Sequence, residues 1–187
     1  MPGRPGCPSV TEILDPWADF SMIRPDVLEH AAGRGSRVHA FIAADLKGEW
    51  MPGIDADCQG YFDSYRRWAD KMVDAVIYVE RELVHSVLGY QGHLDLFARI
   101  KNKQMAVIDW KTPVAESKPW GPQIAGGYWA LLVDYKFVVN PGGACAVMLS
   151  PKGKMAKLID YTPVQAQCEA VFLSALNVHN WMKGGKE

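Results

Sequence analysis

Long apolar runs are missing from this chain of 187 residues. A helix that crosses a membrane needs about 18 or more uninterrupted apolar residues, and no window of the sequence supplies them. The first residues, 1–9, are rich in proline and glycine and lack the apolar core of a signal peptide. We therefore expect a protein of the cytoplasm that has no membrane partner.

Cysteine is scarce, and its spacing argues against a zinc site. The four cysteines, Cys7, Cys58, Cys145 and Cys168, form no CxxC pair and no Cys/His cluster with zinc-binding spacing. A disulfide framework is not expected in a chain of this size without an export signal. The sequence therefore predicts buried or incidental thiols.

An excess of positive charge is also missing. The chain has 20 lysines and arginines against 21 aspartates and glutamates, a formal net charge of −1, so any surface that binds nucleic acid must be local. Apolar residues make up 49% and charged residues 22% of the chain, the ordinary balance of a globular domain with a full core. We expect one domain over residues 26–187, preceded by an irregular, proline-rich segment over residues 1–25.

The periodicity of apolar residues predicts several helices and strands. Apolar and aromatic residues at helical spacing predict a helix over residues 58–74. A helix is also expected over residues 26–47, with an interruption near Gly33 and Gly35, where Ser36 would cap a second helical segment. Further helices are expected over 122–135 and 163–182, strands over 75–84, 88–100, 105–111, 144–150 and 155–161, and turns at 101–104 and 140–143. This order predicts an α/β domain with a central mixed β-sheet flanked by helices.

Acidic side chains occur in each of the first three expected strands, as Glu82, Asp95 and Asp109. Because side chains at i and i+2 of a strand point to the same face, Asp109 and Lys111 should lie together. Taken alone, such a pair is more often a salt bridge on an exposed surface. The apolar residues around Asp109 argue against this, because a carboxylate in a buried strand needs a metal ion or strong donors. Carboxylates beside an ammonium group can hold a divalent cation and activate water for phosphodiester cleavage.

Together these residues resemble the PD-(D/E)xK nuclease superfamily, and within it the RecB-like exonuclease branch, over roughly residues 33–135. The central signature matches Asp95 and the run 108–111, which reads Ile-Asp-Trp-Lys. The upstream glutamate of the branch matches Glu82, and its helical histidine matches His39. The resemblance implies a restriction-endonuclease-like core and a DNA-cleaving site that uses Mg²⁺ or Mn²⁺. It implies no iron–sulfur cluster, because the cysteines that hold one in some relatives are not matched.

A glutamine and a tyrosine on the helix after the sheet extend the resemblance. They match Gln123 and Tyr128, which are five residues apart instead of the four that place both side chains on one helical face. At about 100° per residue, Tyr128 would lie about 140° further round a regular helix. Either the helix is irregular around Gly126 and Gly127, or Tyr128 has another role.

The resemblance implies a role for each residue of the central signature. Asp95, Asp109 and the backbone carbonyl of Trp110 would bind the metal ion, with His39 as a further ligand. Lys111 would orient the attacking water and help to stabilise the charge that develops on the phosphate.

Residues around the signature receive supporting roles. Glu82 would position a metal-bound water or Lys111, and Gln123 would contact the DNA backbone or the same lysine. Tyr128 is grouped with Gln123 as a nucleic-acid-binding residue. The basic candidates for phosphate contacts that flank the site are Arg34, Arg37 and Lys118. Further candidates for phosphate contacts are Arg66, Arg67, Lys152, Lys154 and Lys157. Solvated surface charge is the simpler interpretation of any one of these basic residues, and a structural role is the simpler interpretation of His85 and His93.

The function expected from the sequence is metal-dependent hydrolysis of DNA. An exonuclease that acts on DNA ends in recombination, repair or phage DNA processing is the preferred interpretation, with linear duplex or single-stranded DNA as partner. The resemblance also admits a homo-oligomer and a recombination partner protein, in a bacterial or phage-infected cell. Two alternatives stay open: a structure-specific or restriction-like endonuclease with the same site, and a non-catalytic DNA-binding protein on the same fold.

Overall fold

A five-stranded mixed β-sheet forms the centre of the protein in this computed structural model, which describes residues 6–19, 21–51, 53–101, 104–113, 115–135 and 142–184. The strands lie in the order β1-β2-β3-β4-β5, with β3 and β4 parallel and the other pairs antiparallel. Their bounds are Val73–Val84 (β1), Gln91–Ile100 (β2), Gln104–Lys111 (β3), Gly143–Met148 (β4) and Lys157–Asp160 (β5). The prediction of an α/β protein with a central mixed sheet is confirmed.

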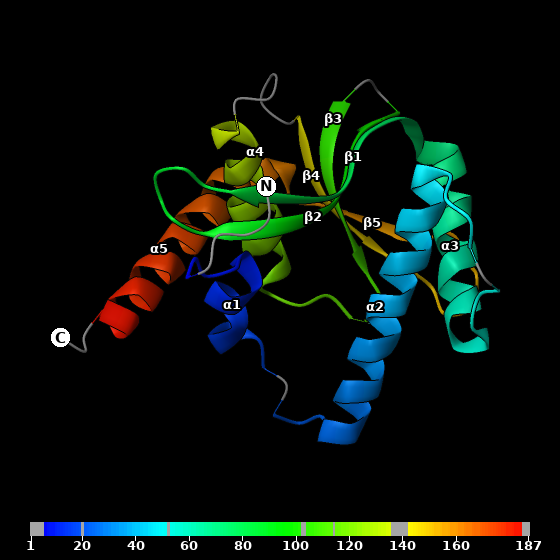
Figure 1. The fold of residues 1–187 in the computed structure, drawn as a ribbon, viewed down its shortest axis with the longest axis horizontal. Coiled ribbons are helices and arrows are strands. Elements are labelled where there is room, and N and C mark those ends of the chain that lie inside the picture. The colour runs from blue at the N-terminus through cyan, green and yellow to red at the C-terminus, as the bar shows by residue number, and fades with distance from the viewer. Residues whose placement is uncertain are drawn as a thin grey trace.

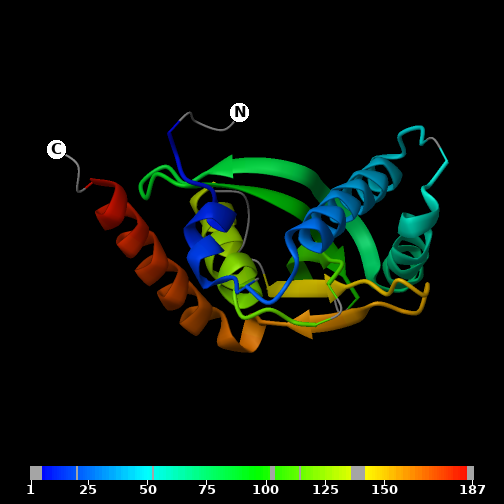
Figure 2. The same cartoon turned by 90° about the horizontal axis from the view of Figure 1, so that it is seen from below.

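Helices cover both faces of this sheet (Figure 1). The helical elements are α1 (Val10–Leu14), η1 (Asp15–Trp17), α2 (Pro25–Lys47), α3 (Ala56–Met72), η2 (Pro122–Tyr128), α4 (Trp129–Asp134), η3 (Thr162–Val164) and α5 (Gln165–Gly184). Figure 2 shows α2 and α3 on one side of the sheet and α1, α4 and α5 on the other. Neighbouring residues of β3 enter different cores: Ile108 packs with α2 and α3, and Val107 with the opposite helices. Within the described ranges, none of the helices combines the length and the apolar character that crossing a bilayer requires.

Helix α2 is continuous, so the expected interruption is wrong. Gly33 and Gly35 lie inside it, and both lower its intrinsic helix propensity. Ser36 caps no second segment, because its hydroxyl donates to the Ala32 carbonyl oxygen one turn earlier, at 3.2 Å. Packing against the sheet compensates for the low helix propensity of the two glycines. Ile42 is fully buried there, and packing of an apolar face supplies most of the stability of a helix in a protein.

The N-terminal segment is not irregular throughout, because it contains α1. Ser9 caps this helix by accepting a hydrogen bond from the Glu12 backbone N–H at 3.0 Å. Val10 and Ile13 are fully buried and join the core on the η2 and α5 side of the sheet. The prolines at positions 8 and 16 flank α1 and do not interrupt it. Residues 1–5 and 20 of this segment, and parts of the expected turns at 102–103 and 140–141, lie outside the described residues.

Candidate metal and catalytic site

Strand β3 brings Asp109 and Lys111 together on one face of the sheet. The Lys111 Nζ atom lies 2.6 Å from Asp109 Oδ2, while Ile108 and Trp110 are buried in the core on the opposite face. The side chains of Lys111 and Asp109 are 13% and 5% exposed. The predicted convergence is confirmed, and the alternative of a salt bridge on an exposed face does not apply.

Asp95 on β2 uses both of its carboxylate oxygens. Its Oδ2 atom accepts a hydrogen bond from the Trp110 backbone N–H at 2.8 Å, and its Oδ1 atom lies 3.2 Å from His39 Nδ1. The middle of α2 therefore reaches the sheet through His39. These contacts explain how a buried carboxylate is tolerated within a strand, since each oxygen has a donor.

Glu80 lies with His39 and Asp95 in one hollow, whereas Glu82, the glutamate expected from the sequence, does not line it. Glu80, His39 and Asp95 offer ligand atoms that all lie within 4.8 Å of one another. The Glu82 side chain is 51% exposed, and its Oε1 atom lies 3.9 Å from His93 Nδ1.

The backbone of β1 accounts for this difference. Glu80 has a φ of 51°, in the left-handed region. Val79 pairs with Leu96 and Arg81 with Leu94, so Glu80 lies level with Asp95, whereas Glu82 pairs with His93. A left-handed residue interrupts the simple alternation of side chains along a strand, and outside glycine, asparagine and aspartate it is uncommon. The sequence offered two glutamates two positions apart, but no residue type that would indicate the irregular backbone.

The helix after β3 explains the five-residue spacing of Gln123 and Tyr128. Residues Pro122–Tyr128 form a π-helical segment, η2, in which residue i bonds to residue i+5. The Gln123 Nε2 atom donates to the Tyr128 hydroxyl oxygen at 3.0 Å. Of the two alternatives left open by the sequence, the irregular helix is confirmed.

Two glycines allow η2 to pack closely between other helices. A Cβ added to Gly126 would lie 2.7 Å from the Cys168 carbonyl oxygen of α5. A Cβ added to Gly127 would lie 2.7 Å from a methyl group of Val10 in α1. The wider π-helical turn and the closely packed glycines therefore occur in the same segment, which is held from both sides.

A chain of hydrogen bonds connects η2 to Lys111. The Lys111 Nζ atom donates to Gln123 Oε1 at 2.9 Å, and Gln123 in turn donates to Tyr128. Tyr128 is buried and lies over Gly92, where an added Cβ would be 3.0 Å from its ring. The expectation that Tyr128 contacts DNA is corrected, because its hydroxyl faces Gln123 inside the protein. Gln123 contacts the lysine, which was one of its two expected roles.

The charges in the site shift the pKa values of its titratable groups. Burial disfavours the charged form of His39, but the Asp95 carboxylate outweighs this and raises the pKa of His39 to about 9. Burial also disfavours the charged form of Asp95, yet His39 and the Trp110 N–H keep the Asp95 pKa below its usual value. For Asp109, burial dominates over the attraction of Lys111, and its pKa rises to about 6. Asp95 is therefore the permanent anion of the site, and Asp109 titrates near neutrality.

These side chains surround one open hollow of about 430 Å³. Trp120 forms part of its wall, with the Lys111 Nζ atom 5.4 Å from the ring centre, within the range of a cation–π contact. The residues that line the hollow are His39, Glu80, His93, Asp95, Asp109, Trp110, Lys111, Thr112, Pro113, Trp120, Gln123 and Tyr128. The candidate ligands whose atoms converge here are two carboxylates and one imidazole, an oxygen-rich set that suits Mg²⁺ or Mn²⁺.

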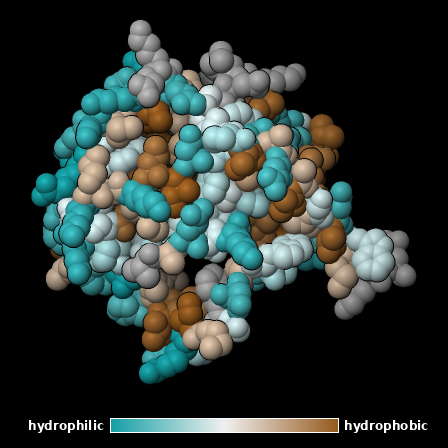
Figure 3. Space-filling view, turned by 180° about the vertical axis from the view of Figure 1, so that it is seen from behind, coloured by the Kyte–Doolittle hydropathy of each residue, from teal (hydrophilic) through white to brown (hydrophobic). Residues whose placement is uncertain are grey.

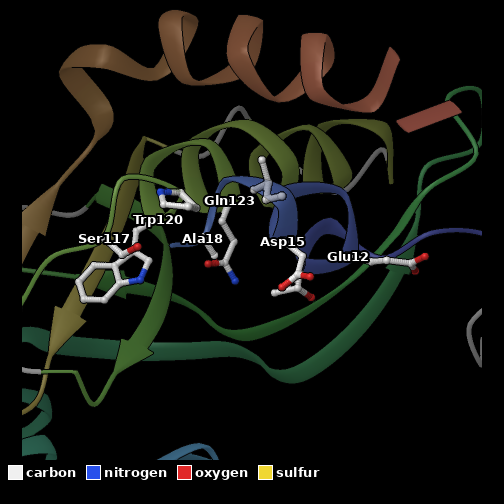
Figure 4. A pocket seen from close by; sticks show the side chains of 9 residues that line it. Glu12, Asp15, Ala18, Ser117, Trp120 and Gln123 are labelled. Atoms are coloured by element: carbon white, nitrogen blue, oxygen red, sulfur yellow. The ribbon is translucent and has the colours of Figure 1, made fainter. Parts of the chain in front are cut away.

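Two further hollows adjoin this one. A largely apolar hollow of about 810 Å³ runs along α2 and shares His39 and Glu80 with the site. Arg34 lines it, with its guanidinium 5.2 Å from the ring centre of Tyr61. A smaller hollow of about 290 Å³ lies on the other side of Gln123, toward the N-terminal helix that carries Glu12 (Figure 4).

Two of the basic residues expected to contact DNA face elsewhere. The Arg37 guanidinium is held in the connection between α2 and α3, with its Nε atom 2.8 Å from Asp55 and its Nη2 atom 2.6 Å from Asp57. Lys118 lines a separate hollow against α5. Arg34 is the flanking arginine that lies beside the site.

The two histidines near the site in sequence differ in position. His93 lines the hollow and forms an ion pair with Glu80. This bond to Glu80 raises the pKa of His93. His85 instead stabilises the turn after β1, where its Nδ1 atom accepts from the Leu88 backbone N–H at 3.2 Å. The structural interpretation thus fits His85, whereas His93 supports a residue of the site.

A scan against protein-family models finds no match for this chain, and a search of curated proteins finds no similar sequence. The chemistry and geometry of the side chains in the hollow are therefore the basis on which a function can be proposed.

Proposed function

We propose that this chain is a metal-dependent DNA nuclease of the PD-(D/E)xK type, built on a restriction-endonuclease-like core. The observation that carries the proposal is the position of the Lys111 ammonium group, which lies between Asp109 and Gln123 in the same hollow as Asp95, Glu80 and His39. A structural ion pair requires only the lysine and one aspartate. The fold adds two further carboxylates and an imidazole to this pair, because the ligand atoms of Asp95, Glu80 and His39 converge within 4.8 Å of one another.

The donor atoms fit a hard divalent cation. Asp95, Glu80 and His39 would hold it, because their ligand atoms converge, and Asp109 lines the same hollow. When bound, such a cation lowers the pKa of a water molecule and polarises the scissile phosphate. His39, whose pKa is about 9 without metal, would release its proton on binding the cation, because only a neutral imidazole coordinates a metal.

The residues of the chain would act on the water and the phosphate. The Lys111 ammonium, fixed by Asp109 and Gln123, would orient the attacking water and stabilise the charge that develops on the phosphate oxygens. Tyr128 would hold Gln123 in place from inside the protein. Arg34, beside the site, would contact the phosphate of a neighbouring nucleotide.

Cleavage of end-labelled linear duplex DNA with Mg²⁺ or Mn²⁺ tests the proposal. Lys111→Ala should lower the cleavage rate by about 10²- to 10³-fold, the loss typical of removing one preorganised charge-stabilising donor. Lys183→Ala removes an exposed lysine of α5 and should leave the rate unchanged. Equal rates for the wild type and Lys111→Ala would exclude the assigned site.

An assay on closed circular DNA distinguishes exonuclease cleavage from endonuclease cleavage by this site. We propose an exonuclease, which spares a closed circle and degrades it after linearisation. Cleavage of the intact circle would identify the alternative, an endonuclease.

A further inference from the structure

A second group of charged side chains lies on α3 and on the turn between β4 and β5. Arg67, Lys71, Lys152 and Lys154 line an open hollow of about 760 Å³. We call this hollow, with its four cationic residues, the basic hollow. Each of them alone is interpreted most simply as solvated charge, but the fold gathers them from two segments that are distant in sequence. This edge of the molecule, over α3, is predominantly hydrophilic in Figure 3.

The positive charge of the basic hollow is only partly compensated. None of its four cations forms an ion pair with a carboxylate of any residue that the structure describes. Asp70 also lines the hollow, and Asp63 lies beside Gly153 of the turn, so two carboxylates face the four cations. Arg66, 3.6 Å from Asp70, is itself paired with Asp45 at 2.7 Å. A local positive potential therefore remains on a chain whose net charge is −1.

The turn that carries Lys152 and Lys154 is fixed to α3. A Cβ on Gly60 would lie 1.9 Å from the Pro151 carbonyl oxygen, so only glycine allows this approach. The Ser150 backbone N–H donates to the Oγ atom of the fully buried Ser64 at 2.9 Å. The backbone positions of the two lysines are therefore set before any ligand binds, which reduces the entropy lost on binding.

The basic hollow is close enough to the candidate site for one DNA molecule to reach both. Met148 of β4 pairs with Lys111 of β3, and neighbouring strands are about 4.8 Å apart. Lys152 follows Met148 by four residues, which span at most about 14 Å. The backbones at Lys111 and Lys152 are thus less than about 20 Å apart, a shorter distance than one turn of a DNA duplex.

We propose that the basic hollow binds the phosphate backbone of duplex DNA and holds the flank of the substrate while an end occupies the candidate site. This rests on the proposed nuclease function. A duplex fits better than a single strand, because the hollow has no aromatic lining residue on which unpaired bases could stack. Lysine and arginine contacts to phosphate position DNA without reading its sequence.

The salt dependence of DNA binding tests this site without metal and hence without cleavage. Fluorescence anisotropy of a labelled duplex in EDTA, over a series of NaCl concentrations, gives the slope of log K against log salt. The triple variant Arg67→Ala, Lys152→Ala, Lys154→Ala should reduce this slope by about 0.9 for each lost phosphate contact, and weaken binding. Circular dichroism of the variant checks that the fold is retained.

A matched pair of variants separates the site from net charge. Lys154→Glu and Lys183→Glu change the charge of the protein equally, but Lys183 lies at the end of α5 and pairs with Glu12. Lys154→Glu should weaken duplex binding by about tenfold or more, with little effect from Lys183→Glu. Equal effects of the two variants, an unchanged salt slope in the triple variant, or stronger binding to anionic vesicles than to DNA would each overturn the proposal.

The proposal for the basic hollow and the proposed nuclease function can fail independently of each other. Lys111→Ala should bind duplex DNA in EDTA and fail to cleave it with Mn²⁺. A wild type that binds DNA through the hollow but never cleaves it would overturn the nuclease function alone. A cleaving enzyme whose triple variant binds like the wild type would overturn the hollow alone.

Discussion

At the scale of single residues, the candidate site depends on which glutamate faces His39 and Asp95. Asp109 and Lys111 could be paired from the sequence, because the two-residue repeat of a strand places them on one face. Glu80 could not be distinguished from Glu82, because the left-handed backbone at Glu80 is a property of the folded strand pair. Such conformations persist only where the surrounding structure stabilises them, and they cluster at functional sites.

Glu80→Gln and Glu82→Gln should therefore have different effects on metal binding. Glu80→Gln removes a charged oxygen that lies with His39 and Asp95, and should lower Mn²⁺ affinity by about tenfold or more. Glu82→Gln changes a half-exposed side chain and should alter the affinity by less than about twofold. Titration calorimetry with Mn²⁺ measures both. A larger loss for Glu82→Gln would show that the upstream glutamate is the one named from the resemblance.

The pKa of Asp109 predicts how the stability of the metal-free protein depends on pH. The pKa is about 6 in the fold, mainly through burial, against 3.8 in the unfolded chain. The folded protein therefore gains a proton on Asp109 as the pH falls from about 6 to about 4, and its free energy of unfolding rises there by at most about 3 kcal/mol. His39 acts in the same direction, since its contribution is present below pH 6.5 and is lost as the pH rises through about 9.

Urea unfolding of the wild type and of Asp109→Asn in EDTA isolates this effect. Between about pH 4 and about pH 7 the wild type should lose stability relative to the variant, in which position 109 carries no titratable group. Parallel pH profiles for the two proteins would contradict the raised pKa of Asp109.

At the scale of elements, the π-helical turn of η2 determines whether Lys111 has its second partner. A regular α-helix would turn Tyr128 away from Gln123, and the hydrogen bond between them would be lost. The sequence signalled the irregularity only as a mismatch in spacing beside two glycines. The close approaches of α1 and α5 to those glycines, which hold the segment in this form, are long-range contacts that local periodicity does not contain.

Tyr128→Phe should lower cleavage more than it lowers stability. It removes the acceptor for Gln123, so the Lys111 ammonium loses its support, and we expect the cleavage rate to fall by about tenfold. Tyr90→Phe is the matched control, because the Tyr90 hydroxyl donates to the Gly127 carbonyl oxygen in the same segment but does not contact Gln123.

Both substitutions remove one buried hydroxyl and should cost about 1–2 kcal/mol of unfolding free energy. Cleavage rates under saturating DNA, together with thermal unfolding, distinguish the two variants. If Tyr90→Phe slowed cleavage as much as Tyr128→Phe, the effect would come from general loosening of η2 and not from the Gln123 contact.

At the scale of the whole molecule, the helices on the two faces of the sheet differ in how clearly the sequence predicts them. Helix α3 was predicted because its apolar spacing extends over several turns, and α2 was predicted with an interruption at its glycines that the fold does not have. Helix α1 has five residues, too few for periodicity to be evident, and its neighbouring prolines favoured an irregular segment. The basic hollow joins residues that are far apart in sequence, and nothing local indicates that they meet.

Two isoleucines of the N-terminal region test the structural role of α1. Ile13 is fully buried, whereas Ile23 is 43% exposed. Ile13→Ala should lower the free energy of unfolding by about 2–4 kcal/mol, and Ile23→Ala by less than about 1 kcal/mol. Urea denaturation of both variants measures this difference. Similar small losses would mean that α1 contributes little to the core.

The contact of α1 and α5 with η2 also predicts how the proposed cleavage activity would be lost on heating. Helices α5 and α1 contact η2 at Gly126 and Gly127, and η2 carries the glutamine that accepts from Lys111. Detachment of either helix would free η2 to relax into an ordinary α-helix while the strands remain paired. On heating, the proposed cleavage activity should therefore be lost at a lower temperature than the one at which the sheet unfolds, leaving an inactive but largely folded intermediate.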